Sequence, residues 1–203
     1  TDDSEAVVRD FRDTRERWIP LPINSGHQSE PNNEGLRQAR GQYIAYLGHD
    51  DLWLPHHLSC LVAVLSAGAD MAYGLTLCVG TEAGDRFLSP ATETYTAGAT
   101  LFPSSVVHNR RMTEQVGGWR LYHEIGMPPD GELWLRAHKA GFHFARAPRL
   151  TVIKFPGSAR RNVYKLRSCH EQEAWFSRIR SDDHLEAEEL IRTLYLSGQT
   201  MQQ

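Results

Sequence analysis

The sequence is poor in cysteine and has no long apolar run. Its three cysteines, at positions 60, 78 and 169, lie far apart and match no zinc-binding spacing. This pattern is not that of a disulfide-rich secreted domain, and it favours a reduced, cytoplasmic setting. The chain also lacks the ~18 consecutive apolar residues that a membrane helix needs and the pattern of a signal peptide, so we expect at most a peripheral contact with a membrane.

An excess of charge of one sign is also absent. The net charge is −3, which provides no general electrostatic attraction to nucleic acid. Hydrophobic residues make up 40% of the chain and charged residues 23%, as in ordinary soluble globular proteins. A length of 203 residues is enough for one domain with a substantial core.

The N-terminal part has no strand before its first helix. Asp2 and Glu5 match a capping box, and residues 4–12 predict an amphipathic helix with its apolar residues facing inward. Because an α/β domain usually opens on a strand, we expect one before residue 1. The next predicted elements are a strand at 17–23, placed at a sheet edge by its prolines, a loop at 24–33 and a helix at 34–40.

The segment Tyr43–Leu58 organises the rest of the chain. Its apolar start, Tyr43–Leu47, predicts a buried strand, and Pro55 predicts the start of a helix. Between them lies the polar turn Gly48-His49-Asp50-Asp51. Because ligands of an open α/β sheet bind beyond the carboxyl ends of strands, the two carboxylates predict a site for Mg²⁺ or Mn²⁺ carrying a diphosphate.

Two other interpretations of this turn stay open. An Asp pair after a strand is often a solvated turn that caps the next helix. The nearby His49, His56 and His57 also allow a second interpretation, a site for a transition metal. Since His56 and His57 would point about 100° apart on a helix, only one of them could share a ligand set with Asp50.

The second half continues the alternation of strands and helices. We expect strands at 70–79, 104–108, 142–145 and 150–153, helices at 110–116 and 131–140, and two further helices within 168–197. Residues 80–98 predict a turn-rich excursion. This order is typical of an α/β fold with crossover connections.

A second group of candidate site residues lies around Asp130. This residue follows Pro128-Pro129 and opens a predicted helix, where it serves either as the N-cap or as a general base that takes a proton from a hydroxyl. Trp119 offers a face on which a sugar ring could stack. Trp134, inside an apolar helix, is expected in the core.

A basic segment follows the last predicted strand. Lys154, Arg160, Arg161, Lys165 and Arg167 fall within fourteen residues. One interpretation is a solvated charged segment. The other is a flexible clamp that neutralises the oxygens of a diphosphate.

Five motifs, in order along the chain, resemble those of the family 2 glycosyltransferases. They are Thr1-Asp2-Asp3-Ser4, Asn33 through Leu47, His49-Asp50-Asp51-Leu52-Trp53, Gly117-Gly118-Trp119 and Asp130 through Arg136. The resemblance covers residues 1–155 and implies the GT-A fold, a Rossmann-like, mixed and mostly parallel α/β sheet flanked by helices. Residues 156–203 would add a basic segment and C-terminal helices packed on the same domain.

The resemblance also implies a function. We expect inverting, metal-assisted transfer of a sugar from a nucleotide-diphosphate donor, a UDP-sugar in the first place, to a hydroxyl of an unknown sugar, lipid or protein acceptor. Asp130 falls on the catalytic base, and Asp50 falls on the ligand of Mg²⁺ or Mn²⁺. Donor contacts are expected from His49, Asp50, Asp51, Asn33, Lys154, Arg160 and Arg161, and acceptor contacts from Trp119 and Glu132.

The chain departs from the family pattern at three places. Gly48 stands where the first Asp of the metal motif is expected, Pro129 stands before the base, and the helix before Gly35 lacks the family's Arg. These departures keep a catalytically silent nucleotide-binding module open as an alternative. A metal-dependent hydrolase is a further alternative, with His49, Asp50 and a downstream His holding two metals ~3.5–4 Å apart.

Overall fold

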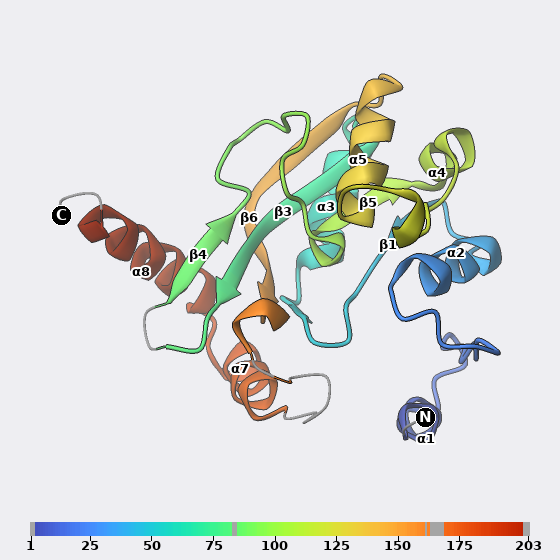
Figure 1. Cartoon of the computed structure of the whole chain (residues 1–203). Coiled ribbons are helices and arrows are strands. Elements are labelled where there is room, and N and C mark those ends of the chain that lie inside the picture. Colours follow the sequence, from blue (N-terminus) through green and yellow to red (C-terminus); the bar gives the residue numbers. More distant parts are fainter. Residues whose placement is uncertain (1–2, 83–84, 161, 163–168, 201–203) are drawn as a thin grey trace.

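A mixed six-stranded sheet forms the centre of the computed structural model, which describes residues 3–82, 85–160, 162 and 169–200 (Figure 1). The strand order is β1-β5-β3-β6-β2, and β4 pairs with β3 outside this path. The strands are β1 (Tyr43–Ala45), β2 (Leu52–Trp53), β3 (Met71–Val79), β4 (Arg86–Ser89), β5 (Val106–Asn109) and β6 (Phe144–Lys154).

The directions of the strands place three carboxyl-terminal strand ends on the same side of this sheet. β3 and β6 pair in parallel, whereas β5 pairs antiparallel with both β1 and β3. β1, β3 and β6 therefore run in the same direction, and their carboxyl ends lie on the same side of the sheet. The mixed sheet is confirmed, but among the described strands only β3 and β6 pair in parallel. One reason is that the short link from β3 to β4 permits only an antiparallel return.

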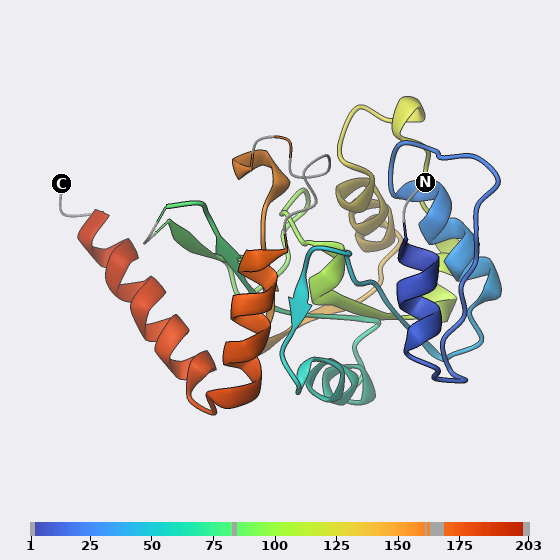
Figure 2. The same ribbon diagram turned by 90° about the horizontal axis from the view of Figure 1, so that it is seen from below.

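Helices cover both faces of the sheet. The described helices are α1 (Ser4–Asp10), α2 (Ser29–Gln38), α3 (His57–Ser66), α4 (Arg110–Val116), α5 (Pro129–Lys139), α7 (His170–Ser181) and α8 (Leu185–Thr200). Met71 and Tyr73 of β3 pack with Trp134 of α5, while the intervening Ala72 packs with Leu61 of α3. Alternate residues of one strand thus face opposite layers, and Figure 2 shows α3 and α5 on opposite sides of the sheet.

The C-terminal helices pack on the same sheet, as expected of a C-terminal helical extension. Trp175 of α7 and Leu185 of α8 share a buried cluster with Leu77 and Phe155. In Figure 1, α7 lies below the ends of β3 and β6, and α8 runs outward beside β4. No helix in the described ranges combines the length and apolar composition that crossing a membrane requires.

Three predictions for the N-terminal part are wrong. Helix α1 buries none of its side chains, and Phe11, predicted to face inward, is 71% exposed. Residues 17–23 form no strand, because Pro20 and Pro22 have no N–H to donate to a ladder. Helix α2 begins at Ser29 rather than at residue 34. Asp2 of the expected capping box lies outside the described residues.

The predictions for the rest of the chain need smaller corrections. The strand at 70–79 and the helix ending at Gly117 are confirmed. The two strands predicted at 142–145 and 150–153 form one continuous strand, β6. Strand β2 was not predicted, and the strand expected from Ser104 starts at Val106, after a 3₁₀ turn, Pro103–Ser105.

Candidate functional site

The pairing of β2 with β6 assembles the first part of the site. Leu52 and Trp53 pair antiparallel with Ile153 and Val152. This register places Asp51, the residue before β2, beside Lys154, the last residue of β6. The turn after β1 and the end of β6 therefore meet where the carboxyl ends of β1, β3 and β6 lie.

Asp51 is the most tightly held carboxylate of the turn. Its side chain is 2% exposed, and its two oxygens lie 3.1 and 3.2 Å from the Lys154 Nζ. The Ser104 hydroxyl donates a hydrogen bond of 2.6 Å to the Asp51 Oδ2 and accepts one of 3.0 Å from the Gly48 N–H. A buried carboxylate needs such partners, so Asp51 anchors both the turn and the lysine.

The neighbouring positions of the turn are more open. Asp50 is half-buried and His49 is exposed. A Cβ at Gly48 would lie 3.1 Å from the Asp51 Oδ2 and 3.3 Å from the Asp50 Oδ1. An aspartate at this position would thus place a third carboxylate against two others, and glycine avoids that repulsion.

These residues do not fit a divalent cation held by protein side chains. Mg²⁺ demands near-octahedral oxygen coordination, but Gly48 supplies no side-chain oxygen. Both oxygens of Asp51 already accept from Lys154. The described part of the chain contains no group of three or more His, Cys, Asp or Glu side chains placed to hold a metal ion. The described residues thus form no complete cation site of their own, and a two-metal hydrolase gains no support from them. A cation held by Asp50 together with a diphosphate stays a prediction.

The histidines near the turn have structural partners. The ring of His57 is buried and stacks on Trp53 with 4.3 Å between ring centroids. Burial, with a smaller effect of the neighbouring His56, lowers the pKa of His57 to about 4. The His56 Nε2 lies 3.0 Å from the Leu150 carbonyl oxygen. Neither ring points to a shared ligand set with Asp50.

Asp130 forms the second part of the site, at the start of α5. It is the second residue of that helix, whose N-cap is Pro128, so the prediction that Asp130 is the N-cap is wrong. Burial raises the pKa of the Asp130 carboxyl, although the backbone N–H groups of Gly131 and Asp130 and the positive charge of Lys154 act in the opposite direction. Lys154 thus acts electrostatically on this carboxyl while it pairs with Asp51.

One connecting segment, residues 101–105, holds both parts together. The Trp134 indole N–H of α5 donates to the Leu101 carbonyl at 3.0 Å. The next residue, Phe102, presents its ring to the Lys154 ammonium, with 5.1 Å between Nζ and the centroid. Ser104 then binds Asp51. The middle of α5, Lys154 and the turn after β1 therefore contact the same short segment.

Asn33, expected at the donor, instead binds the backbone of Trp119. Its amide donates to the Trp119 carbonyl and accepts from the Trp119 N–H, both at 2.8 Å. Trp119 is 3% exposed, and its indole N–H donates to the Tyr46 hydroxyl at 3.2 Å. The prediction that Trp119 offers an exposed face for stacking is therefore wrong, whereas Trp134 lies in the core as expected.

Glu132, expected at the acceptor, holds α5 against the end of α4. It is 9% exposed, and its carboxylate pairs with Arg136 at 2.7 Å and with Arg120 at 3.3 Å. Arg136 in turn donates to the Gly117 and Gly118 carbonyls at 3.0 and 2.8 Å. Glu132 is thus paired with two guanidinium groups, and with both of them it lines a small cavity of about 240 Å³. Its expected contact with the acceptor stays a prediction.

Of the two described residues of the predicted basic clamp, Lys154 and Arg160, only Lys154 contacts Asp51. Arg160 binds Glu171 at 2.6 and 2.7 Å and donates to the Val79 and Gly80 carbonyls at 3.1 and 3.3 Å. Its side chain is 7% exposed. Glu171 foremost, and Asp50 to a smaller extent, raise the pKa of Arg160. Arg160 thus fixes the turn after β6, while Arg161, Lys165 and Arg167 lie outside the described residues.

Sequence reasoning missed Ser104 and the buried network behind the site. The Tyr46 hydroxyl lies 3.0 Å from the His108 Nε2 in the core. Ser104 follows a proline before a short strand, a position with no distinctive pattern. Only the fold, which brings Ser104 to Asp51 across 53 residues of sequence, reveals its role.

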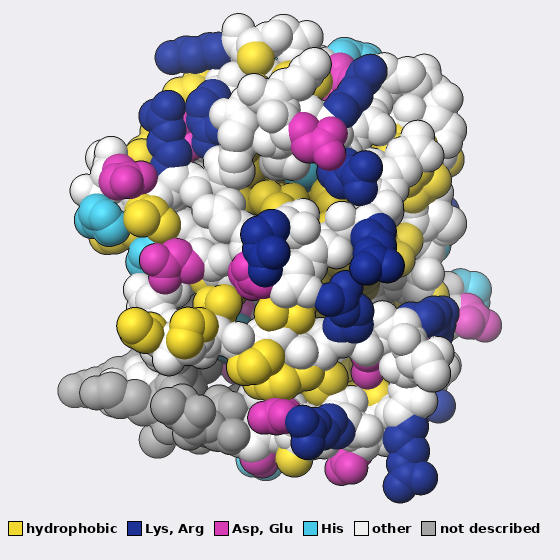
Figure 3. Space-filling model, turned by 90° about the vertical axis from the view of Figure 1, so that its right-hand side faces the viewer, with side chains coloured by type: hydrophobic (Ala, Val, Ile, Leu, Met, Phe, Trp, Pro, Cys, Tyr) yellow, Lys and Arg dark blue, Asp and Glu magenta, His cyan; other side chains and the backbone are white. Residues whose placement is uncertain are grey.

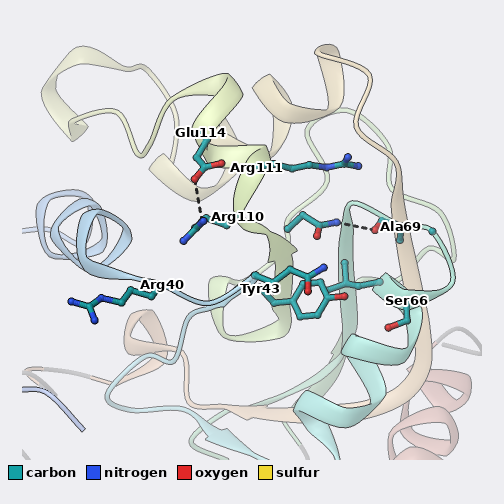
Figure 4. Close-up of a pocket in the computed structure, with 11 residues that line it drawn as sticks. Arg40, Tyr43, Ser66, Ala69, Arg110, Arg111 and Glu114 are labelled. Carbon is teal, nitrogen blue, oxygen red and sulfur yellow. Dashed lines mark hydrogen bonds and ion pairs between the residues drawn. The ribbon is translucent and has the colours of Figure 1, made fainter. Parts of the chain in front are cut away.

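A separate cavity lies at the opposite ends of these strands, where β1 and β3 begin. It has a volume of about 660 Å³, and its lining includes Arg40, Tyr43, Ser66 and Arg110 (Figure 4). The guanidinium group of Arg110 pairs with Glu114 at 3.1 Å. Figure 3 shows basic side chains scattered among acidic ones on the face that it presents. This cavity is distinct from the site at Lys154.

The comparisons with known proteins give one matching sequence family and, separately, one matching fold. The sequence model of glycosyl transferase family 2 matches residues 1–125, more than half of the chain. S. aureus TarS (residues 1–349) in complex with UDP-GlcNAc superposes with a TM-score of 0.60 at 15% identity, covering 77% of this chain and 47% of that one. Another TarS 1–349 structure gives a TM-score of 0.63 at 16% identity, covering 82% and 51%. The GT-A expectation for the fold is thereby confirmed.

A curated relative is similar over a shorter stretch. The uncharacterized protein y4gI of Sinorhizobium fredii is 41% identical over 66 residues, which is 32% of this chain and 7% of that protein. This chain therefore spans about half the length of the TarS 1–349 structures and a small part of the S. fredii protein.

Proposed function

The chain belongs to glycosyl transferase family 2, and from this membership we propose that it transfers a sugar from a nucleotide-diphosphate donor to an acceptor hydroxyl, with inversion at the anomeric carbon. A UDP-sugar is the first donor to test, because TarS, which has this fold, was solved with UDP and with UDP-GlcNAc. The acceptor is a sugar, lipid or protein with a free hydroxyl.

The proposed reaction is a single displacement. The acceptor oxygen forms a bond to the anomeric carbon, while the bond from that carbon to the β-phosphate oxygen breaks and its electron pair stays on the departing UDP. The acceptor proton moves to the Asp130 carboxylate. Attack from the face opposite to the leaving group inverts the anomeric configuration.

The observation that supports this assignment is the environment of Asp130. Burial raises the pKa of its carboxyl, against the lowering effects of helix N–H groups and Lys154. A general base works best when its pKa lies nearer to the working pH than that of a free carboxyl. Lys154 provides a positive charge that acts on this carboxyl, as a site for an anionic leaving group requires.

A catalytically silent nucleotide-binding module is the second candidate. Gly48 removes one carboxylate of the expected motif, and Asp51 is already neutralised by Lys154. This candidate predicts that UDP binds but that no donor is turned over.

The test compares wild type with Asp130→Asn and with Asp183→Asn, an exposed control. We expect Asp130→Asn to bind UDP with a Kd close to that of wild type and to release UDP from UDP-sugars at least ~100-fold more slowly, since general bases contribute that much or more. Asp183→Asn should leave both quantities unchanged. UDP release from Asp130→Asn at the wild-type rate would remove Asp130 from its role, and UDP binding without release by wild type would favour the silent module.

A further inference from the structure

We propose that Lys154 supplies the positive charge at the leaving diphosphate and that transfer proceeds without a divalent cation. This inference rests on the proposed glycosyl transfer and concerns the same site. It departs from the metal-assisted mechanism that the sequence motifs led us to expect.

The first support is the position of the lysine ammonium. Its Nζ lies 3.1 and 3.2 Å from the two oxygens of Asp51, a residue of the turn that resembles a metal-binding motif. The ammonium thus binds both oxygens of one carboxylate of the turn, which is how a bidentate metal cation would bind it. A divalent cation bidentate to Asp51 would have to displace it.

The second support is that the ammonium is held in place but not enclosed. Asp51 fixes it from one side and is itself fixed by the Ser104 hydroxyl, while the ring of Phe102 faces it from another. The Lys154 side chain keeps 20% of its exposure, against 2% for Asp51. Because an ammonium carries three N–H donors, contact with Asp51 leaves it able to donate to a phosphate oxygen.

The third support is the contrast with Arg160. The guanidinium group of Arg160 is committed to Glu171 and to two backbone carbonyls. Of these two cationic side chains, Lys154 is the one whose charge acts on Asp130. Lys154 therefore contacts the carboxylate of the turn and acts by its charge on the proposed base, as expected of a cation that binds the diphosphate of a donor.

The chemical step needs no co-reactant beyond the donor and the acceptor. As the bond from the anomeric carbon to the β-phosphate oxygen breaks, negative charge gathers on UDP, and Lys154 stays protonated and donates a hydrogen bond to a phosphate oxygen. Asp130 takes the acceptor proton. Asp51 is a positioning residue, because it acts by holding the ammonium.

Calorimetric titration with UDP, in excess EDTA and again in excess Mn²⁺, tests the proposal. The proteins are wild type, Lys154→Gln, Lys154→Arg and, as a matched control, Lys139→Gln, which changes an exposed lysine at the end of α5. Because Lys154→Gln leaves Asp51 buried without its cation, a double variant, Asp51→Asn with Lys154→Gln, replaces the ion pair by two neutral amides.

We expect the Kd of wild type for UDP to differ less than threefold between EDTA and Mn²⁺. Lys154→Gln and the double variant should raise the Kd by about tenfold or more in both conditions, as loss of a charge-assisted hydrogen bond predicts. Lys154→Arg should retain most of the affinity, and Lys139→Gln should match wild type.

Two results would overturn the proposal in different ways. If wild type binds UDP at least tenfold more tightly with Mn²⁺ than with EDTA, or if both Lys154→Gln proteins bind as wild type does, the lysine does not replace the cation and the transferase assignment still stands. If UDP, ADP, GDP, CDP and dTDP all fail to bind in either condition, the proposed function itself fails, and the inference fails with it.

Discussion

The reassignment of Asn33 from the donor to the backbone of Trp119 predicts a strong coupling with Gly118. The Asn33 side chain makes two hydrogen bonds of 2.8 Å to the Trp119 backbone. A Cβ at Gly118 would lie 2.3 Å from the Asn33 Oδ1, a distance at which one of the two residues must move. Gly118→Ala and Asn33→Ala should therefore destroy the same pair of hydrogen bonds.

The expected magnitude follows from that pair. Each hydrogen bond contributes about 1 kcal/mol net, so each single variant should lower the free energy of unfolding by about 2 kcal/mol. In the double variant the clash is gone, because the next atom near the new Cβ is the Leu36 Cδ1 at 3.8 Å. The double variant should also lose about 2 kcal/mol rather than ~4, a coupling of about 2 kcal/mol.

Urea unfolding of the four proteins measures this coupling. Gly35→Ala is the control, because a Cβ at that position of α2 meets nothing within 4 Å, and alanine should stabilise the helix by about 0.5–1 kcal/mol. Additive losses in the double variant, or a neutral Gly118→Ala, would refute the proposed contact and reopen a ligand-binding role for Asn33.

Two further predictions concern the core. Gly74→Ala should destabilise the protein by about 1–3 kcal/mol, because its Cβ would lie 2.1 Å from the Thr151 Oγ1 between β3 and β6. Urea unfolding checks this cause, because adding Thr151→Ala to Gly74→Ala should recover part of the lost free energy of unfolding. Burial lowers the pKa of both His57 and His108 to about 4 in the folded state, from an ordinary value of 6.5. Between these two pH values the unfolded chain therefore binds more protons than the folded one. The free energy of unfolding should be highest above pH 6.5 and should fall toward pH 4, by up to about 1.4 kcal/mol per pH unit for each histidine. His57→Phe should reduce this slope by about half, and an unchanged slope in urea unfolding at several pH values would contradict the assignment.

Local patterns were sufficient where burial or a helix end leaves a plain signal in the sequence. The apolar run of β3, which is buried on both faces, and the glycine that ends α4 are such signals, and both predictions are confirmed. The segment 17–23 misled because apolar residues between prolines look like a strand, although their backbone cannot complete a ladder. Helix α1 misled in another way: its apolar stripe is real, but within the described residues it packs against no core cluster.

The site was predictable in outline but not in its contacts. Motif order pointed to the turn after β1, which contacts Lys154, and to the start of α5, where the charge of Lys154 acts on the pKa of Asp130. The division of roles between Asp50 and Asp51 depends on the register of β2 against β6, and β2, only two residues long, leaves no periodic pattern. The partners of Asn33 and Ser104 lie 86 and 53 positions away in the chain, a separation at which only tertiary packing decides.

A carboxyl ¹³C NMR titration of Asp130, in wild type and in Lys154→Gln, tests most directly whether the base and the lysine face one site. The pKa of Asp130 should lie above its ordinary value of 3.8 in wild type, because of burial, and should rise further in Lys154→Gln, because a positive charge that favours the carboxylate is removed. A pKa of Asp130 that does not change when Lys154 loses its charge would show that the two groups do not share a site, and the proposed mechanism would be wrong.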